Sequence, residues 1–200
     1  MANLKETILN PILKGNPITV LVLGICSSLA VTVQLKGACV MALSVIAVTG
    51  LSSLIVSLLR NTIPNRVRII VQLVVVALMV ILVDQFLKAY AYAVDKQLSV
   101  YIGLIITNCI VMGRIEAFAL GNKPIPSLLD GLANGFGYGL ILVVVAFFRE
   151  LLGSGTLFGF QVLPDAYIPN NLVILPPFAL ILLGCIIWAH RAFDKELQEK

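Results

Sequence analysis

Four cysteines, at positions 26, 39, 109 and 185, are the residues of this sequence best suited to redox or metal chemistry. In an apolar helix a free cysteine usually packs as a small hydrophobic side chain. That interpretation fits Cys39 and Cys185, which are predicted to lie near opposite faces of a membrane. The two cannot share a site or form a disulfide, because a disulfide needs Cα atoms within about 7 Å of each other.

Cys26 and Cys109 differ from the other two because each lies in a short apolar segment among small or polar residues. Such neighbours allow close backbone approach and supply hydrogen-bond donors; they are Gly24, Ser27, Ser28, Thr107 and Asn108. Two thiolates brought together there suit iron. An iron–sulfur cluster usually takes four thiolates, so a second chain must supply the others. Zinc also needs four ligands, and His190 is predicted to be an interfacial residue at the membrane boundary.

The segments that hold these cysteines belong to a membrane protein. Of the 200 residues, 60% are hydrophobic and only 12% are charged, whereas an ordinary soluble domain has about 25% charged residues. Apolar stretches long enough to cross a bilayer cover residues 37–59, 67–86, 131–148 and 171–189, and shorter ones cover 17–33 and 98–112. We therefore predict an all-α integral membrane protein with six transmembrane helices, of which the first and fourth are short or half-length.

The six predicted spans form a single membrane domain over residues 1–200, which divides into two halves of three, at about 16–90 and 97–191. Aligning Cys26 with Cys109 also brings Arg60 close to Arg149, after a longer loop in the second half. Because three is an odd number, the two halves insert with opposite orientation. The sequence thus predicts two inverted three-helix repeats, in which both cysteines reach the middle of the bilayer, where such proteins place their functional site.

The basic residues indicate orientation rather than nucleic-acid binding. The net charge is +4, and no aromatic–basic interleaving typical of nucleic-acid binding is present. On six spans the N-terminal side carries Lys5, Lys14, Arg60, Arg66, Arg68, Arg114, Lys123, Arg191, Lys195 and Lys200. The opposite side carries Lys36, Lys88, Lys96 and Arg149. This bias predicts both termini in the cytoplasm, and lipid and protein partners but no nucleic acid.

Three charged residues near the predicted span ends each have two interpretations. Arg114 and Glu116 are either functional, as ionisable residues inside a membrane usually are, or a boundary pair that reaches the cytoplasmic interface. Asp84 is either a cation ligand or a helix-end carboxylate. Small-residue faces that pack against a partner protein or another helix are predicted at Gly131, Gly135, Gly137 and Gly139. No phosphate-binding loop, catalytic triad or dinucleotide fingerprint is present, so no complete active site is expected in this chain.

The cysteine segments resemble those of the D-subunit family of sodium-translocating NADH:quinone oxidoreductases. The resemblance covers nearly the whole chain and is most specific over residues 107–119, with further matches at 23–32, 63–70, 126–131 and 148–159. The related E subunit of the Rnf electron-transport complex is an alternative, although its longer C-terminal part is not matched by the short tail after Arg191. A small secondary transporter is a second alternative. Its solute site would favour carboxylates, hydroxyls or unwound carbonyls over two thiols.

The resemblance implies that Cys26 and Cys109 bind iron and hold half of an intramembrane 2Fe-2S cluster, which two cysteines of a homologous E subunit, of opposite orientation, complete. It implies a six-subunit complex in the bacterial inner membrane that passes electrons from NADH to ubiquinone and moves sodium outward. NADH, FAD, FMN, riboflavin and ubiquinone then bind only to other subunits. The chain is then one subunit of a translocase and has no catalytic residue of its own.

Overall fold

The computed structural model describes residues 15–64, 66–90, 101, 103–158, 160–161 and 171–193. Three of its helices are long and apolar enough to cross a membrane, namely α3 (Leu35–Leu59), α4 (Arg68–Tyr90) and α7 (Pro124–Gly153). Helix α9 (Pro176–Phe193) is apolar but shorter. The first three match three of the long stretches expected from the sequence, whereas the fourth, 171–189, is divided between a short helix at Asn171–Ile174 and α9. The full count of six spans stays a prediction. Basic residues of the topology prediction that fall outside the described residues are Lys5, Lys14, Lys96, Lys195 and Lys200.

The ends of α7 follow from local sequence. Pro124 occupies its first turn, where a missing backbone N–H costs nothing because the first N–H groups of a helix have no partner within it. Beyond Gly153 the chain turns at Gly155, which has a φ of 68°, a conformation common just after helices. A short antiparallel hairpin of β1 (Thr156–Leu157) and β2 (Phe160–Gln161) follows. This hairpin is a small addition to the predicted all-α fold.

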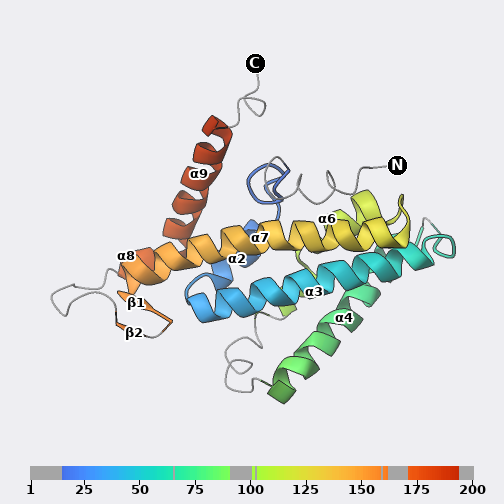
Figure 1. Ribbon diagram of the computed structural model, residues 1–200, viewed down its shortest axis with the longest axis horizontal. Helices are drawn as coiled ribbons and strands as arrows, with labels where there is room; N and C mark the ends of the chain where they lie inside the picture. Colours follow the sequence, from blue (N-terminus) through green and yellow to red (C-terminus); the bar gives the residue numbers. More distant parts are fainter. Residues whose placement is uncertain are drawn as a thin grey trace.

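The centre of the fold is the antiparallel pair of α3 and α7, which lie side by side over most of their length (Figure 1). A Cβ atom on Gly131 would lie 2.8 Å from the carbonyl oxygen of Thr49, and one on Gly135 would lie 2.9 Å from Ile46 Cα. Real Cβ contacts are longer, so only glycine allows the two backbones to approach this closely. The small-residue face of α7 therefore packs against another helix of the same chain.

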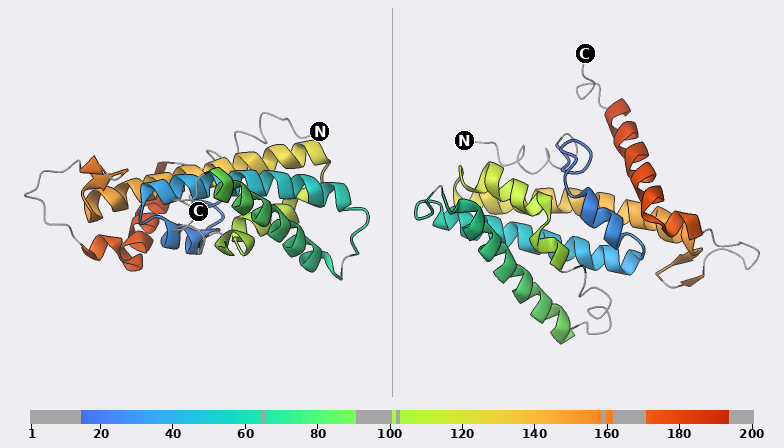
Figure 2. Two further views of the ribbon diagram at one scale, coloured as in Figure 1. Left: turned by 90° about the horizontal axis from the view of Figure 1, so that it is seen from below. Right: turned by 180° about the vertical axis from the view of Figure 1, so that it is seen from behind.

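Short helices lie on one side of this pair. They are α2 (Ile25–Val31), α6 (Cys109–Arg114) and the π-helix η1 (Ile115–Ala119). In the left-hand view of Figure 2, α3 and α7 form the upper layer and the short helices lie beneath it. A further short helix, α8 (Asn171–Ile174), precedes α9.

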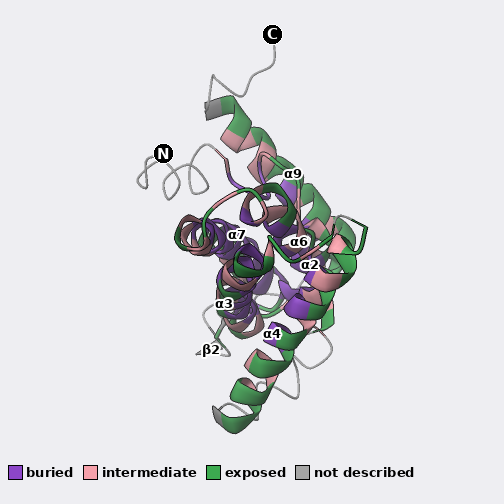
Figure 3. Cartoon of the chain, turned by 90° about the vertical axis from the view of Figure 1, so that its right-hand side faces the viewer, coloured by how far each residue is buried: buried purple, intermediate pink, exposed green. Residues whose placement is uncertain are grey.

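Helices α4 and α9 are largely uncovered within this chain, as Figure 3 shows. The exposed apolar side chains of α4 include Ile69, Ile70, Val74, Leu78, Ile81 and Leu82. A monomeric soluble protein rarely exposes so many large apolar side chains on one helix. The surface is typical of a chain that is surrounded by lipid or by other membrane proteins.

Candidate functional site

Cys26 and Cys109 each lie at the start of a short helix, directly after a break in the chain's helical course. Cys26 is the second residue of α2, and the preceding residues 15–24 are not helical and include a turn at 17–21. Cys109 is the first residue of α6, and residues 107–108 separate α6 from helical residues 103–106. The two apolar stretches that looked too short in the sequence are thus interrupted at the cysteines.

Gly24 permits the first of these breaks. Its φ is 78°, a conformation that residues with a Cβ atom rarely adopt. A Cβ atom at this position would lie 2.5 Å from Ile110 Cδ1 and 3.2 Å from Tyr138 Cε2. The backbone before Cys26 therefore lies directly against the residue that follows Cys109 and against α7.

Asn108 makes the second break and joins the two cysteine segments. Its side-chain oxygen accepts a hydrogen bond from the backbone N–H of Ile110 at 3.1 Å, which caps the first turn of α6. Its amide nitrogen donates to Ser27 Oγ at 3.4 Å, across 81 residues of sequence. The residue after Cys26 is thereby bonded to the residue before Cys109.

A buried polar layer lies beside the two exposed cysteines. Ser27, Asn108 and Tyr138 are all buried, and the Ser27 and Tyr138 hydroxyls lie 2.8 Å apart. Cys26 and Cys109 are free thiols and are exposed in the isolated chain. Within the described ranges no group of three or more His, Cys, Asp or Glu side chains is suited to a metal ion. Two free thiols on hydrogen-bonded segments are half the number of thiolates that an iron–sulfur cluster usually takes.

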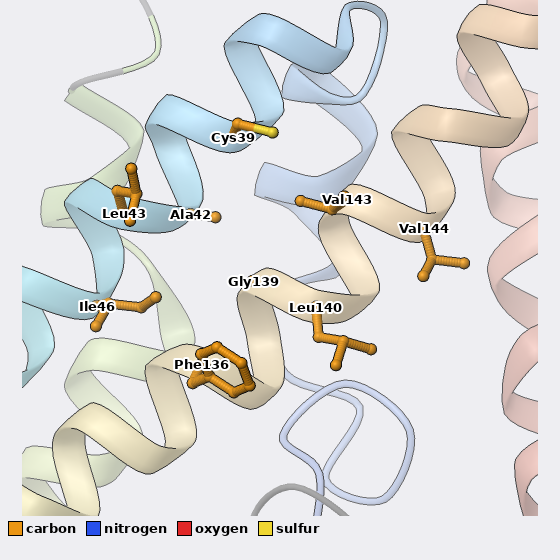
Figure 4. A pocket seen from close by; sticks show the side chains of 9 residues that line it. All are labelled: Cys39, Ala42, Leu43, Ile46, Phe136, Gly139, Leu140, Val143 and Val144. Atoms are coloured by element: carbon orange, nitrogen blue, oxygen red, sulfur yellow. The ribbon is translucent and has the colours of Figure 1, made fainter.

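The other two cysteines lie elsewhere. Cys39 lines an apolar groove of about 430 Å³ between α3 and α7, together with residues such as Phe136 and Leu140 (Figure 4). In that view α2 lies behind the two long helices. Cys185 is an exposed residue of α9. Neither belongs to the two short helices that begin at Cys26 and Cys109.

The charged residues near the second cysteine form two separate clusters. Arg114 donates two hydrogen bonds to Asp130, of which the one from Nε to Oδ2 is 3.0 Å long. Glu116 pairs instead with Arg68 and accepts a hydrogen bond from Gln72 at 2.8 Å. Arg114 and Glu116 therefore have separate partners and do not pair with each other.

Asp84 pairs with Lys88 one helical turn later, near the end of α4. This contact favours the interpretation of Asp84 as a helix-end carboxylate.

The carboxylate that pairs with Arg114, Asp130, is buried, with a side chain that is 5% exposed. One signal for it was present in the sequence, an acidic residue directly before the apolar stretch 131–148, and that signal was missed.

Replacing Arg114 with methionine is expected to destabilise the protein by about 3–5 kcal/mol, because it leaves the buried Asp130 carboxylate without its cation. The double variant Arg114→Met/Asp130→Asn is expected to recover part of that loss. Thermal unfolding of the purified complex in detergent measures both, with the exposed Arg66→Met as control. A single variant as stable as the control would contradict a structural role for the ion pair.

Comparison of the sequence with those of known proteins assigns the chain to a family. The sequence matches the family described as Rnf-Nqr subunit, membrane protein, over residues 4–187. The chain belongs to the Rnf-Nqr family. Within this family it is 56% identical to the D subunit of the Na(+)-translocating NADH-quinone reductase of Aeromonas salmonicida, over 100% of this chain and 98% of that relative. The corresponding D subunit of Aeromonas hydrophila subsp. hydrophila matches equally well, at 56% identity over the same shares.

The resemblance inferred from the cysteine segments is therefore confirmed over the full chain. These Rnf-Nqr relatives are named as subunits of an oxidoreductase complex. The chain is accordingly a membrane protein of the kind that works as one part of a multisubunit enzyme.

Proposed function

We propose that this chain is the membrane subunit of a Na⁺-pumping NADH:quinone oxidoreductase that holds half of an intramembrane 2Fe-2S cluster through Cys26 and Cys109. The main support is that both cysteines begin short helices whose flanking residues are hydrogen-bonded to each other. Two cysteines of a homologous E subunit, of opposite orientation, complete the ligand set. NADH, FAD, FMN, riboflavin and ubiquinone bind to other subunits of the six-subunit complex.

The cluster supplies one-electron transfer inside the membrane, and this chain supplies its geometry. Gly24 and Asn108 end the preceding segments, so that α2 and α6 start at the thiols. The hydrogen bond between Asn108 and Ser27 fixes the spacing of the two segments. The exposure of both sulfurs leaves one side of the site open to the partner protein.

We also propose that the single membrane domain has six spans in two inverted repeats, at about 16–90 and 97–191. The packing of α3 on α7 supports this through three contacts: Ala42 with Gly139, Ile46 with Gly135 and Gly50 with Gly131. If Arg60 corresponds to Arg149, each residue of α3 corresponds to the residue of α7 that lies 89 positions later. Ala42 then corresponds to Gly131 and Gly50 to Gly139, so the correspondence exchanges the first and third contacts. Ile46 corresponds to Gly135, which is its own partner. Contacts that exchange in this way are expected around a two-fold axis that relates two halves of opposite orientation.

The arginines at the ends of the two long helices give independent support. Arg149, at the end of α7, donates to the Leu29 carbonyl at 3.1 Å and to Thr32 Oγ1 at 2.6 Å, at the end of the Cys26 helix. Arg60, at the end of α3, donates to the Asn122 carbonyl at 2.7 Å, beyond the Cys109 helix and η1. Each arginine thus bonds to the other half at a point after that half's cysteine helix begins.

The proposed location is the bacterial inner membrane, with both termini in the cytoplasm. The support is the distribution of basic residues along the sequence, since cytoplasmic loops of membrane proteins carry an excess of Lys and Arg. In this location the complex moves electrons from NADH to ubiquinone and sodium outward.

The proposal is tested by iron content and the 2Fe-2S electron paramagnetic resonance (EPR) signal of the purified complex. Cys26→Ser and Cys109→Ser are each expected to lose one cluster, whereas Cys39→Ser keeps it, because cluster irons need thiolate ligands. Native gels establish that each variant complex is assembled. Unchanged iron in all three variants would contradict cluster ligation and favour a transporter or scaffold role.

A further inference from the structure

Tyr138 is a fully buried polar residue in the middle of α7, next to the cysteine segments. Its side chain is 0% exposed, and its hydroxyl oxygen lies 2.8 Å from Ser27 Oγ. Its ring packs against Gly24. A buried hydroxyl without a hydrogen-bond partner is costly, so this contact ties α7 to the start of α2.

The direction of each hydrogen bond follows from the donors available. The amide of Asn108 is oriented by the bond that its oxygen accepts from the Ile110 N–H, so its nitrogen donates to Ser27. Ser27 has one hydroxyl proton, which it donates to the Gly24 carbonyl at 3.0 Å. Either hydroxyl could donate in the remaining contact, and with the Ser27 proton directed to Gly24 the donor is Tyr138. This chain of hydrogen bonds ends at the carbonyl of Gly24, two residues before Cys26.

Among the described residues this network exists in one half only. The shift of 89 residues that relates α7 to α3 carries Tyr138 onto Thr49. The Thr49 hydroxyl bonds to the Val45 carbonyl within its own helix, at 2.6 Å. Tyr138 therefore links α7 to both cysteine segments, directly through Ser27 and onward to Asn108, in a way that its counterpart does not.

We propose that Tyr138 is a positioning residue that acts through Ser27 and Asn108 on both cysteine segments and thereby sets the reduction potential of the cluster. The inference rests on the proposed cluster ligation. Residues behind the direct ligands orient those ligands and tune the metal centre, and hydrogen bonding around the cluster is one of the protein's means of setting its potential.

The test is a redox titration, followed by EPR, of the purified complex carrying Tyr138→Phe, Ser27→Ala or both. Each variant is expected to keep its iron. At the midpoint potential of the parent complex, the ratio of reduced to oxidised cluster is expected to change by about threefold or more, which is the scale of one net hydrogen bond. Because both groups act through one chain of bonds, the double variant is expected to shift no further than Ser27→Ala. Thr49→Val is the matched control and is expected to titrate like the parent.

An unchanged midpoint and EPR line shape in Tyr138→Phe would overturn the inference, as would an equal shift in Thr49→Val or additive shifts in the double variant. If Tyr138→Phe fails to assemble, Ser27→Ala decides alone: a parental midpoint overturns the inference, and a shifted midpoint supports it. A parent complex with no cluster at Cys26 and Cys109 would instead defeat the proposed function, so the two failures are distinguishable.

Discussion

Replacing Gly131 with valine is expected to prevent stable folding of the protein, at a cost of about 3 kcal/mol or more. A Cβ atom at Gly131 would lie 2.8 Å from the Thr49 carbonyl oxygen and 3.1 Å from Gly50 Cα. Both are backbone atoms of α3, so neither can rotate away, and the central helix pair has to separate. The amount of the protein in membranes and the thermal unfolding temperature of the purified complex measure the effect.

The matched control is Gly184→Val in α9. This residue is also a helical glycine in an apolar segment, but a Cβ atom there would meet nothing within 4 Å among the described residues. The control therefore shares the change in helix propensity and lacks the close contact. An equal loss of stability in the two variants would show that the loss at Gly131 does not come from helix packing.

The sequence predicted the packing role of these glycines but not their partner. Spacing by four residues places Gly131, Gly135 and Gly139 on one face of a helix, and such a face packs equally well against α3 or another protein. The choice depends on the complementary face of α3, where Ala42 and Gly50 provide room. That face follows no pattern strong enough to identify it before the helices are placed together.

The interrupted helices were predictable in length but not in detail. Two apolar stretches too short to cross the bilayer indicated that the first and fourth segments are unusual. The positions of the breaks depend on Gly24 and Asn108. Glycine and asparagine also occur inside transmembrane helices, so their identity alone does not fix a break.

Single polar residues inside apolar stretches were the main omission. Tyr138 contacts Ser27 across 111 residues of sequence, and Arg149 contacts Leu29 across 120. Arg149 is buried, and its guanidinium also donates to the Val173 and Ile174 carbonyls at the end of α8. Such partners are set by tertiary structure, and no local periodicity encodes them. The informative signal was the presence of a polar residue in a membrane segment at all.

Replacing Gly24 with alanine is expected to abolish the proposed cluster while the protein stays in the membrane. An L-residue at a φ of 78° costs about 1–2 kcal/mol, and the added Cβ atom would lie 2.5 Å from Ile110 Cδ1. Both effects push apart the segments that carry Cys26 and Cys109. The iron content and EPR signal of the purified complex measure the loss.

Two further variants separate the causes of that loss. Gly103→Ala is the matched control, since it lies on the approach to Cys109 and a Cβ atom there would meet nothing within 4 Å among the described residues. Ile110→Val removes the Cδ1 atom, so Gly24→Ala/Ile110→Val is expected to regain part of the cluster if the contact matters. A double variant that regains nothing would assign the loss to backbone strain at Gly24 or to the contacts that remain with residue 110 and with Tyr138 Cε2. Full cluster content in Gly24→Ala itself would show that the cysteine segments do not need their close contact to hold iron.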